Sequence, residues 1–248
     1  MHESGETLTE PSPASPELKP FSHFYFLVSA TVVVGVVAYA LVNISALPDP
    51  LPIHWNAAGE ADNFAKRNLA TVLMQFGFGP GFTLIVLWLF ALTVHFFAKQ
   101  KPSKFDQVTE MDVARRIESA NLSLKYIGLW TLVLTTVLSF MMWSTYFLES
   151  HVEGSFWWEL VAILIIIFAL VGSLAHAQSR AQNKYPPEDS KKKLKWGIIY
   201  HNPEDHRLMV ECQPGNYTIN FAHKASWLII GGLLLPSVLV TLLSVFFA

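Results

Sequence analysis

The sequence predicts an all-α integral membrane protein with five transmembrane helices and a small cytoplasmic antiparallel β meander. The first observation is composition: apolar residues make up 52% of the chain and charged residues only 15%, against about 25% charged residues in an ordinary soluble domain. The second is that long stretches of the chain contain no Asp, Glu, Lys or Arg. A helix rises about 1.5 Å per residue, so about 20 apolar residues cross a hydrocarbon core of about 30 Å.

Five uncharged stretches are long enough to cross a bilayer. We expect helices near residues 22–43, 72–97, 126–148, 157–177 and 226–247. The alternative, five buried helices of a soluble protein, requires each helix to turn a polar face to water. Residues 82–96, FTLIVLWLFALTVHF, have no such face, and this favours the membrane.

The leader, residues 1–20, is acidic and rich in Ser, Pro and Glu. A signal peptide starts with basic residues, so the first apolar stretch is not predicted to be one. The composition favours a disordered cytoplasmic tail. Residues 21–177 follow as the predicted four-helix membrane region.

The loop 44–71 between the first two predicted helices is the most distinctive segment, and its residues 47–67 read LPDPLPIHWNAAGEADNFAKR. An ordinary connector needs only a few small polar residues, so this composition predicts an ordered loop. Alternating prolines between positions 48 and 52 favour an extended segment close to polyproline II. Residues 57–59, Ala-Ala-Gly, favour a turn.

The polar side chains of this loop have two interpretations. His54, Glu60 and Asp62 offer one nitrogen and two carboxylates, a possible set of zinc ligands. Their spacing matches no established site, so we favour bracing, in which His54 or Asn56 bonds to backbone groups that the prolines leave free. We expect His54 and Asp62 to point into the loop or onto the helix ends. Trp55 suits a membrane–water interface.

The second predicted helix contains Gly-Phe-Gly-Pro-Gly at residues 77–81. Pro80 has no backbone donor and clashes with the preceding turn, so a kink is expected. Such a kink marks either close packing of helices or a binding cavity, and we favour packing. Residues 104–125 alternate apolar and charged side chains, which predicts a surface helix that continues into the third span.

The basic residues predict the orientation, because Lys and Arg are retained on the cytoplasmic side of short loops. Of the 17 Lys and Arg residues, all but Lys66 and Arg67 lie in the tail, in segment 98–125 or in segment 178–225. We expect a multi-pass plasma-membrane protein with a cytoplasmic amino terminus and an extracytoplasmic carboxyl terminus. The net charge is only −2, and no general basic surface indicates binding to nucleic acid.

The segment 178–225 combines a basic run with a β pattern. The run is expected to lie near anionic lipid, and its residues are Lys191, Lys192, Lys193 and Lys195. Apolar runs at 197–200 and 208–210 flank a predicted turn at 202–205. A third alternating run completes a predicted meander near residues 197–221.

The third run places its apolar side chains, Tyr217, Ile219 and Phe221, at alternate positions. Three short strands bury too little surface to be stable alone. We therefore expect this apolar face to pack on the inner ends of the helices or on a protein partner. Residues 226–248 follow as the fifth transmembrane helix.

Two groups of residues resemble known bacterial sequences. The outer loop carries the pattern Leu47, Pro48, Pro52, His54, Trp55, Asn56, Gly59, Asp62 and Lys66. It resembles the signature of a bacterial membrane domain of unknown function, which forms the amino-terminal part of the SdpI immunity protein family. The resemblance covers about residues 25–97 and implies no reaction. The Arg-Thr-Pro-rich motif in the carboxyl-terminal half of those proteins is missing from this chain.

The second group lies in the predicted β module. Its residues are Trp196, Gly197, Tyr200, Asn202, Pro203, Asp205, Val210, Gly215, Thr218, Asn220, Phe221 and Trp227. They resemble a short domain, also of unknown function, which is found beside the first one in bacterial membrane proteins. This resemblance covers about residues 195–227.

Few ionisable groups fall within the predicted spans, and those that do lie near the helix ends: His23, His95, His176 and Glu159. A proton or ion path needs such a group near the membrane midplane. The sequence also contains no Gly-rich phosphate loop, no His-Glu-x-x-His motif and no persuasive nucleophile with a base. We expect neither catalysis nor a cofactor.

Three functions remain open. The first is a non-catalytic protein that works by contact with a protein or peptide in sensing, immunity or envelope signalling. The second is an accessory subunit of a larger membrane complex. The third is a small-solute transporter, which the lack of internal repeats disfavours.

Overall fold

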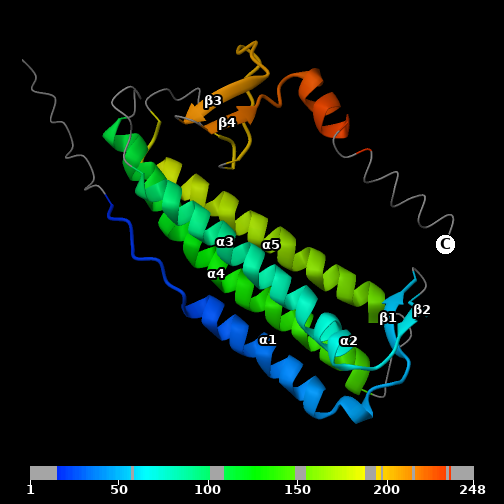
Figure 1. Cartoon of the computed structure of the whole chain (residues 1–248). Helices are drawn as coiled ribbons and strands as arrows, with labels where there is room; N and C mark the ends of the chain where they lie inside the picture. Colours follow the sequence, from blue (N-terminus) through cyan, green and yellow to red (C-terminus); the bar gives the residue numbers. More distant parts are fainter. Residues whose placement is uncertain are drawn as a thin grey trace, which may run out of the picture.

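A computed structural model of the chain describes residues 16–56, 59–100, 109–148, 155–187, 194–196, 198–213, 216–232 and 235. Its main body is a bundle of long helices (Figure 1). These helices are α1 (Phe24–Val42), α3 (Gly79–Lys99), α4 (Glu110–Phe147) and α5 (Ser155–Lys184). Within the described residues, four helical segments are long and apolar enough to cross a membrane. This pattern indicates a multi-pass membrane protein.

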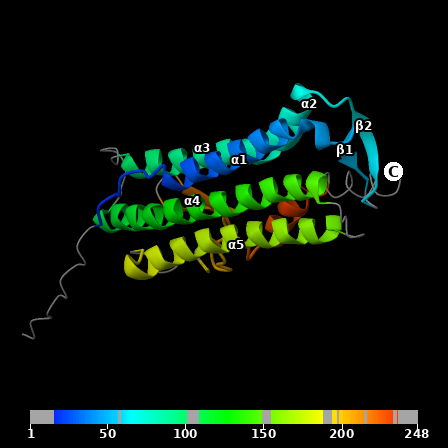
Figure 2. The same ribbon diagram turned by 90° about the horizontal axis from the view of Figure 1, so that it is seen from below.

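The helix α4 is the centre of the bundle and packs against α1, α3 and α5 (Figure 2). Small and hydroxyl side chains let neighbouring helices approach it closely. Gly128 illustrates this, because a Cβ added there would lie 2.8 Å from the ring of Tyr25 on α1. Large apolar residues such as Phe82 and Phe168 are exposed on the outside of the bundle, where a bilayer would cover them.

The second predicted span is one helical segment with a change of winding. Its parts are α2 (Leu69–Leu73), a π-helical turn η2 (Met74–Phe78) and α3. Pro80 cannot donate the hydrogen bond of an α-helix. In a π-turn each carbonyl pairs with the residue five positions later, and this change of winding ends two positions before Pro80. Gly77 lies in this turn beside Val37 of α1, a contact consistent with helix packing.

The predicted surface helix and third span form a single helix, α4, of 38 residues. It begins with a capping box, in which Thr109 and Asp112 satisfy each other's backbone N–H groups. At about 1.5 Å per residue α4 is about 57 Å long, well above the thickness of a hydrocarbon core. It therefore extends beyond the membrane, and the predicted surface helix begins at Glu110 within the described residues.

We call the loop 44–71 the outer loop and the segment 178–225 the inner module, after the sides predicted for them. The described residues of the outer loop are more regular than the sequence indicates. A short 3-10 turn, η1 (Ile44–Ala46), is followed by an antiparallel hairpin of β1 (Leu51–Trp55) and β2 (Ala61–Ala65). The Asp49–Pro50 peptide is cis, and Gly59 turns the chain with a φ of 82°. Residues 57 and 58 of the predicted turn lie outside the described residues.

The inner module contains a second hairpin, β3 (Met209–Gln213) and β4 (Asn216–Ile219). The predicted three-stranded meander is wrong in its first strand: the described residues there form only isolated bridges, at Lys195–Ile199 and Tyr200–Asn220. Trp196 has a φ of 54°, which turns the chain back at the point where an extended run was expected. The bridge from Tyr200 to Asn220 is parallel.

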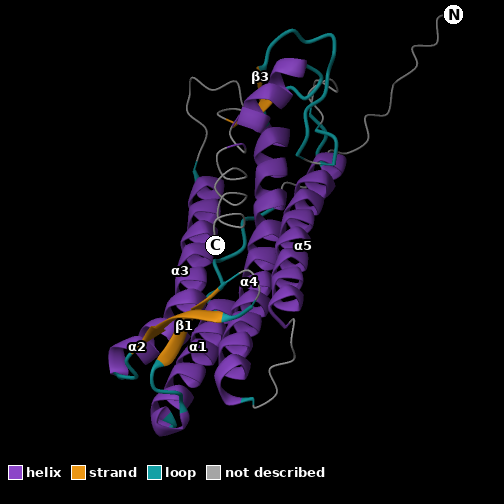
Figure 3. Ribbon diagram, turned by 90° about the vertical axis from the view of Figure 1, so that its right-hand side faces the viewer, coloured by secondary structure: helices purple, strands orange, loops and turns teal. Residues whose placement is uncertain are grey.

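The two hairpins lie at opposite ends of the helix bundle (Figure 3). The hairpin β1–β2 lies beside the ends of α1 and α2, and β3–β4 lies at the other end (Figures 1 and 3). Past β4, residues 224–232 are helical. Most of the predicted fifth span, 226–247, and residues 1–15 of the predicted tail lie outside the described residues.

Candidate functional site

The outer hairpin is anchored by two buried leucines. Leu47 and Leu51 belong to one buried cluster with Val72 and Phe76 of the second helical segment and Ala40 of α1. Leu51 is the first residue of β1, and strand side chains alternate between faces, so one face of β1 is fixed on the helix ends. The burial of these leucines joins hairpin, α1 and α2 into one unit.

The helix α4 holds the hairpin through Tyr146. The Tyr146 hydroxyl donates a hydrogen bond to the carbonyl of Pro52 in β1. Its ring also lies 6.0 Å from Trp55 and 5.1 Å from Phe76, centroid to centroid. Pro52 has no N–H to donate, but its carbonyl can still accept a hydrogen bond. Tyr146 of α4 provides the donor. Trp55 therefore packs on α4 at the end of the bundle.

The base of the hairpin is closed by Arg67. Its Nη1 donates to the carbonyl oxygens of Ser45, at 3.1 Å, and of Leu47. Its backbone N–H donates to the carboxylate of Asp49 at 3.2 Å, and the two side chains form an ion pair at 3.9 Å. The guanidinium has its donors in a fixed planar fork. The Arg67 side chain therefore bonds to the residues directly before and directly after Ala46.

The outward side of the hairpin carries the polar side chains. His54 Nδ1 lies 2.6 Å from a carboxylate oxygen of Asp62 across the two strands, with the side chains 64% and 44% exposed. The turn is braced by Asn56, whose side chain bonds to the backbone and carboxylate of Glu60. The prediction that His54 and Asp62 point into the loop or onto the helix ends is wrong. Apolar side chains occupy the inner face, so the polar pair bonds to itself in solvent.

The signature residues of the outer loop thus divide into two sets. Leu47, Pro52 and Trp55 contact the helices, whereas His54, Asn56 and Asp62 face outward. The remaining signature residues are Pro48, Gly59 and Lys66, of which Gly59 has the positive φ of the turn and Lys66 is exposed.

Sequence reasoning missed the two residues that hold the hairpin in place, Arg67 and Tyr146. A signal existed for Arg67, because it and Lys66 are the only Lys or Arg residues in the outer loop and it lies two positions before α2. Tyr146 lies 94 residues from its partner Pro52, and no local pattern indicates such a contact.

The metal interpretation gains no support from the geometry of the described residues. Across the ranges that the structure describes, no three His, Cys, Asp or Glu side chains come together as a metal site requires. His54 and Asp62 form a pair, and Glu60 instead bonds to Asn56. Asn56 does bond to a backbone N–H, that of Glu60, whereas His54 bonds to a side chain.

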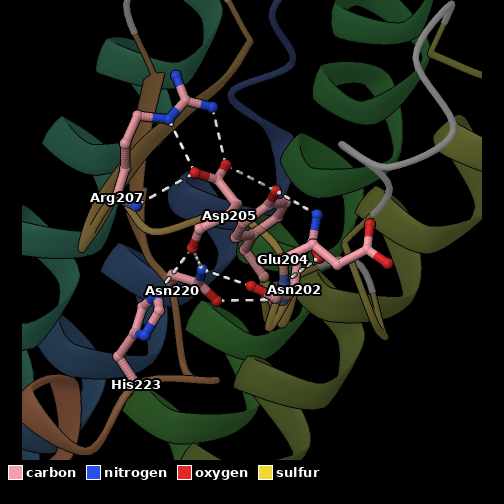
Figure 4. Close-up of polar contacts among 7 residues, drawn as sticks. Asn202, Glu204, Asp205, Arg207, Asn220 and His223 are labelled. Carbon is pink, nitrogen blue, oxygen red and sulfur yellow. Dashed lines mark hydrogen bonds and ion pairs between the residues drawn. The ribbon is translucent and has the colours of Figure 1, made fainter.

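The inner module is organised around the buried side chain of Asn220 (Figure 4). Its Nδ2 donates to the carbonyl oxygens of Asn202 and Asp205, both at 2.8 Å, and its Oδ1 accepts from the Asn202 N–H at 3.1 Å. The Nε2 of His223 donates to the Asp205 carbonyl at 2.6 Å. Asn220 therefore fixes the predicted turn at 202–205 against the end of β4.

Arg207 neutralises the carboxylate of this network. Its guanidinium donates to both oxygens of Asp205, at 2.9 and 2.8 Å, and the Tyr200 hydroxyl donates to the same carboxylate at 3.1 Å. The hydrogen bonds from Arg207 are the main reason that the pKa of Asp205 lies well below its usual range. Tyr200 itself is buried with Val210, and Leu194 packs against them.

Of the predicted apolar face, Ile219 and Phe221 are half-buried. The ring of Phe221 packs edge-on against Trp227 at 5.4 Å. The side chain of Tyr217 lies outside the described residues, as do Lys191, Lys192 and Lys193 of the basic run. Trp196 is exposed, and Pro203 lies in the turn that Asn220 holds.

The first turns of α4 contact two other segments, the residues after α5 and the amino-terminal segment. Arg115 is only 2% exposed, pairs with Asp112 and donates at 3.1 Å to the carbonyl of Tyr185, just past the end of α5. A buried cation needs such partners, because desolvating it alone is costly. Asn121 bonds to the backbone of the amino-terminal segment at residues 17 and 19. Both ends of α4 are therefore fixed to other parts of the chain.

Comparison with known proteins identifies one region. The family described as "Domain of unknown function (DUF1648)" matches residues 31–78. This stretch contains most of α1, the hairpin β1–β2, α2 and η2, which together form the anchored outer unit. No curated protein and no solved structure matches the chain.

Proposed function

We propose that this chain is a non-catalytic bacterial plasma-membrane protein that binds a protein or peptide at its outer hairpin, in sensing, immunity or envelope signalling. The observation that supports the proposal is the division of the hairpin into two sides. Leu51 and Tyr146 fix one side on the helices, whereas His54, Asp62 and Phe64 are exposed on the strands. A rigid support with exposed polar and aromatic groups is suited to recognition.

The proposal includes the orientation and the fifth span. The distribution of Lys and Arg supports an extracytoplasmic hairpin, a cytoplasmic amino terminus and an inner module at 178–225. The helical residues 224–232 and the uncharged sequence that follows support a fifth transmembrane helix at 226–247. The carboxyl terminus is then extracytoplasmic, and the bilayer and anionic lipid near Lys195 are additional partners.

The family assignment also extends beyond the matched domain. We infer that residues 25–97 correspond to the amino-terminal part of the SdpI immunity family, and residues 195–227 to the second short domain. The signature residues in the anchored hairpin support the first assignment. The network of Asn202, Asp205 and Asn220 supports the second, because these residues share one structural role.

The proposal is tested with a photo-crosslinking amino acid at Asn63, an exposed residue of β2. In native membranes we expect one discrete protein adduct. The adduct should disappear when Leu51→Asp releases the hairpin from the helices, at equal membrane insertion. The matched control is the same amino acid at Phe82, exposed on α3, which should react with lipid alone. Absence of the adduct, together with turnover or transport by the purified protein, would refute the proposal.

An accessory subunit of a larger complex is the second candidate. The observation in its favour is the exposed apolar surface at Trp227, Leu228 and Ile229, at the start of the proposed fifth span. Purification from native membranes in mild detergent distinguishes the two functions. A subunit should co-purify with one complex at a fixed stoichiometry, whereas a contact protein should be recovered mostly by itself.

A further inference from the structure

We propose that the inner module lies flat against the cytoplasmic leaflet of its own membrane, with one apolar face of its sheet in contact with lipid. This inference deepens the proposed function, and it rests on the orientation and the fifth span proposed there. It replaces the alternatives of the sequence analysis, in which the helices or a protein partner covered this face.

The two faces of the small sheet differ in chemistry. Side chains alternate along a strand, so Val210 and Asn220 share the face that packs with Tyr200 and carries the polar network. Met209 is paired with Ile219 in the register of β3 and β4, and both therefore belong to the opposite face. That opposite face is apolar at this pair, and the next pair along it in the register is Glu211 and Tyr217.

The apolar face is incompletely covered by the rest of the described chain. Met209 is 63% exposed, and its cross-strand neighbour Ile219 is half-buried. Trp196, in the turn between Lys195 and Ile199, is 75% exposed. Apolar side chains exposed together on one small module indicate contact with another apolar surface.

Both ends of the module lie close to the predicted membrane boundaries of the neighbouring spans. At its start, the N–H of Leu194 donates to the side chain of Gln182 at 3.2 Å. Gln182 is two positions beyond Arg180, the first charged residue after the uncharged part of α5. At its end, Lys224 is the last charged residue before an uncharged stretch that reaches residue 248. A small sheet fixed at both ends in this way lies along the membrane surface.

The residues around the apolar face match the interface of a bilayer. Trp227 follows Lys224, and Trp is enriched at membrane–water interfaces. Its ring contacts Phe221, and its Nε1–H donates to the Phe221 carbonyl at 3.2 Å. Lys195 and Lys224 add positive charge on the side of the membrane where anionic lipids attract it. This combination of apolar, aromatic and basic groups favours lipid as the surface that covers the apolar face.

The experiment uses the full-length protein in nanodiscs that contain anionic lipid. After Cys212→Ser, a single cysteine at Met209 is labelled with an environment-sensitive fluorophore, and some lipids carry a quencher at the top of the acyl chain. The matched control carries the label at His206, an exposed position in the same module. We expect a blue-shifted emission and loss of most of the signal to the quencher at position 209, with little loss at 206.

The other outcomes overturn the inference in distinct ways. A blue-shifted emission without quenching would mean that protein covers the face, and a water-like emission would mean that nothing does. Equal quenching at positions 209 and 206 would show that the apolar face is no closer to lipid than the rest of the module. Ile219→Asp in the labelled protein should reduce the quenching at 209. Labelling of single cysteines at residues 63 and 248 with an impermeant reagent tests the orientation and the fifth span separately. A failure of the proposed function can therefore be told apart from a failure of this inference.

Discussion

At the scale of single residues, the most informative side chains are charged groups directed at the backbone. Arg67 lies in a loop that has only one other basic residue, yet its guanidinium bonds to the carbonyl oxygens of Ser45 and Leu47. Arg115 bonds to the carbonyl of Tyr185 in the same way at the other end of the bundle. Arg67 therefore closes the loop on itself, whereas Arg115 fixes the segment after α5 onto α4.

The first prediction concerns Arg67. Arg67→Met removes the donors to two carbonyl oxygens, and hydrogen bonds to charged groups contribute about 1.5–3 kcal/mol each. We expect a loss of stability of that order and a clearly lower midpoint of thermal unfolding in detergent. Lys66→Met, which changes the neighbouring exposed cation, is the control and should leave the midpoint nearly unchanged. Equal effects of the two changes would contradict the role of the guanidinium.

The second prediction is a pH dependence of the inner module. Because hydrogen bonds from Arg207 lower the pKa of Asp205 in the folded state, the ionised carboxylate stabilises the module above its unfolded pKa of about 3.9. That contribution is lost only as the pH falls through the lower folded pKa. Arg207→Gln should raise the folded pKa toward the ordinary value. A carboxyl NMR titration measures the shift, and identical curves for variant and wild type would contradict it.

At the scale of elements, the long helices follow from the sequence and the hairpins do not. Hydropathy and the absence of charge place α1, α3, α4 and α5, because a bilayer demands about 20 apolar residues in any spanning helix. The strand β1 contains Pro52 and follows two other prolines, so local propensity favoured an extended loop without pairing.

The hairpin β1–β2 forms because distant residues support it. Leu51 finds Val72 and Phe76 on the second helical segment, and Tyr146 supplies a donor from α4. Contacts over such a separation leave no periodic signal in the sequence. In the inner module, Trp196 has a positive φ and turns the chain directly before the apolar run at 197–200, where a strand was predicted.

The third prediction tests the connection between hairpin and α4. Tyr146→Phe removes one hydrogen bond to the Pro52 carbonyl but keeps the ring contacts, so we expect a local cost of about 0.5–1.5 kcal/mol. Hydrogen exchange of the amides in β1 and β2 should become faster by a corresponding factor. Tyr39→Phe changes another ring packed on Phe147 and should leave this exchange rate unchanged. Unaltered exchange in Tyr146→Phe would show that the hairpin is held by the leucines alone.

At the scale of the whole molecule, α4 connects the two most elaborate segments of the chain. Its outer end contacts the hairpin through Tyr146, and its inner end holds the segment after α5 through Arg115. Because α4 is one continuous helix, it provides a direct structural connection between the hairpin and its other end. This geometry suits the sensing function proposed above.

The last prediction is the arrangement of the chain across the membrane. In a Cys212→Ser background, a single cysteine at Asn63 should react with an impermeant thiol reagent in intact cells, because all but two of the 17 Lys and Arg residues lie outside the loop 44–71. A cysteine at His206, in the inner module, should react only after the membrane is opened. These two positions together determine on which side each hairpin lies.

A third position, Ala248, determines the number of spans. If residues 226–247 cross the bilayer, the end of the chain lies outside, and a cysteine at 248 should react in intact cells like the one at 63. If they do not cross, the end remains inside and reacts only after lysis, while the result at 63 is unchanged. Reaction at 63 only after lysis would reverse the orientation itself. The spans and the orientation therefore succeed or fail independently, because each depends on a different part of the sequence.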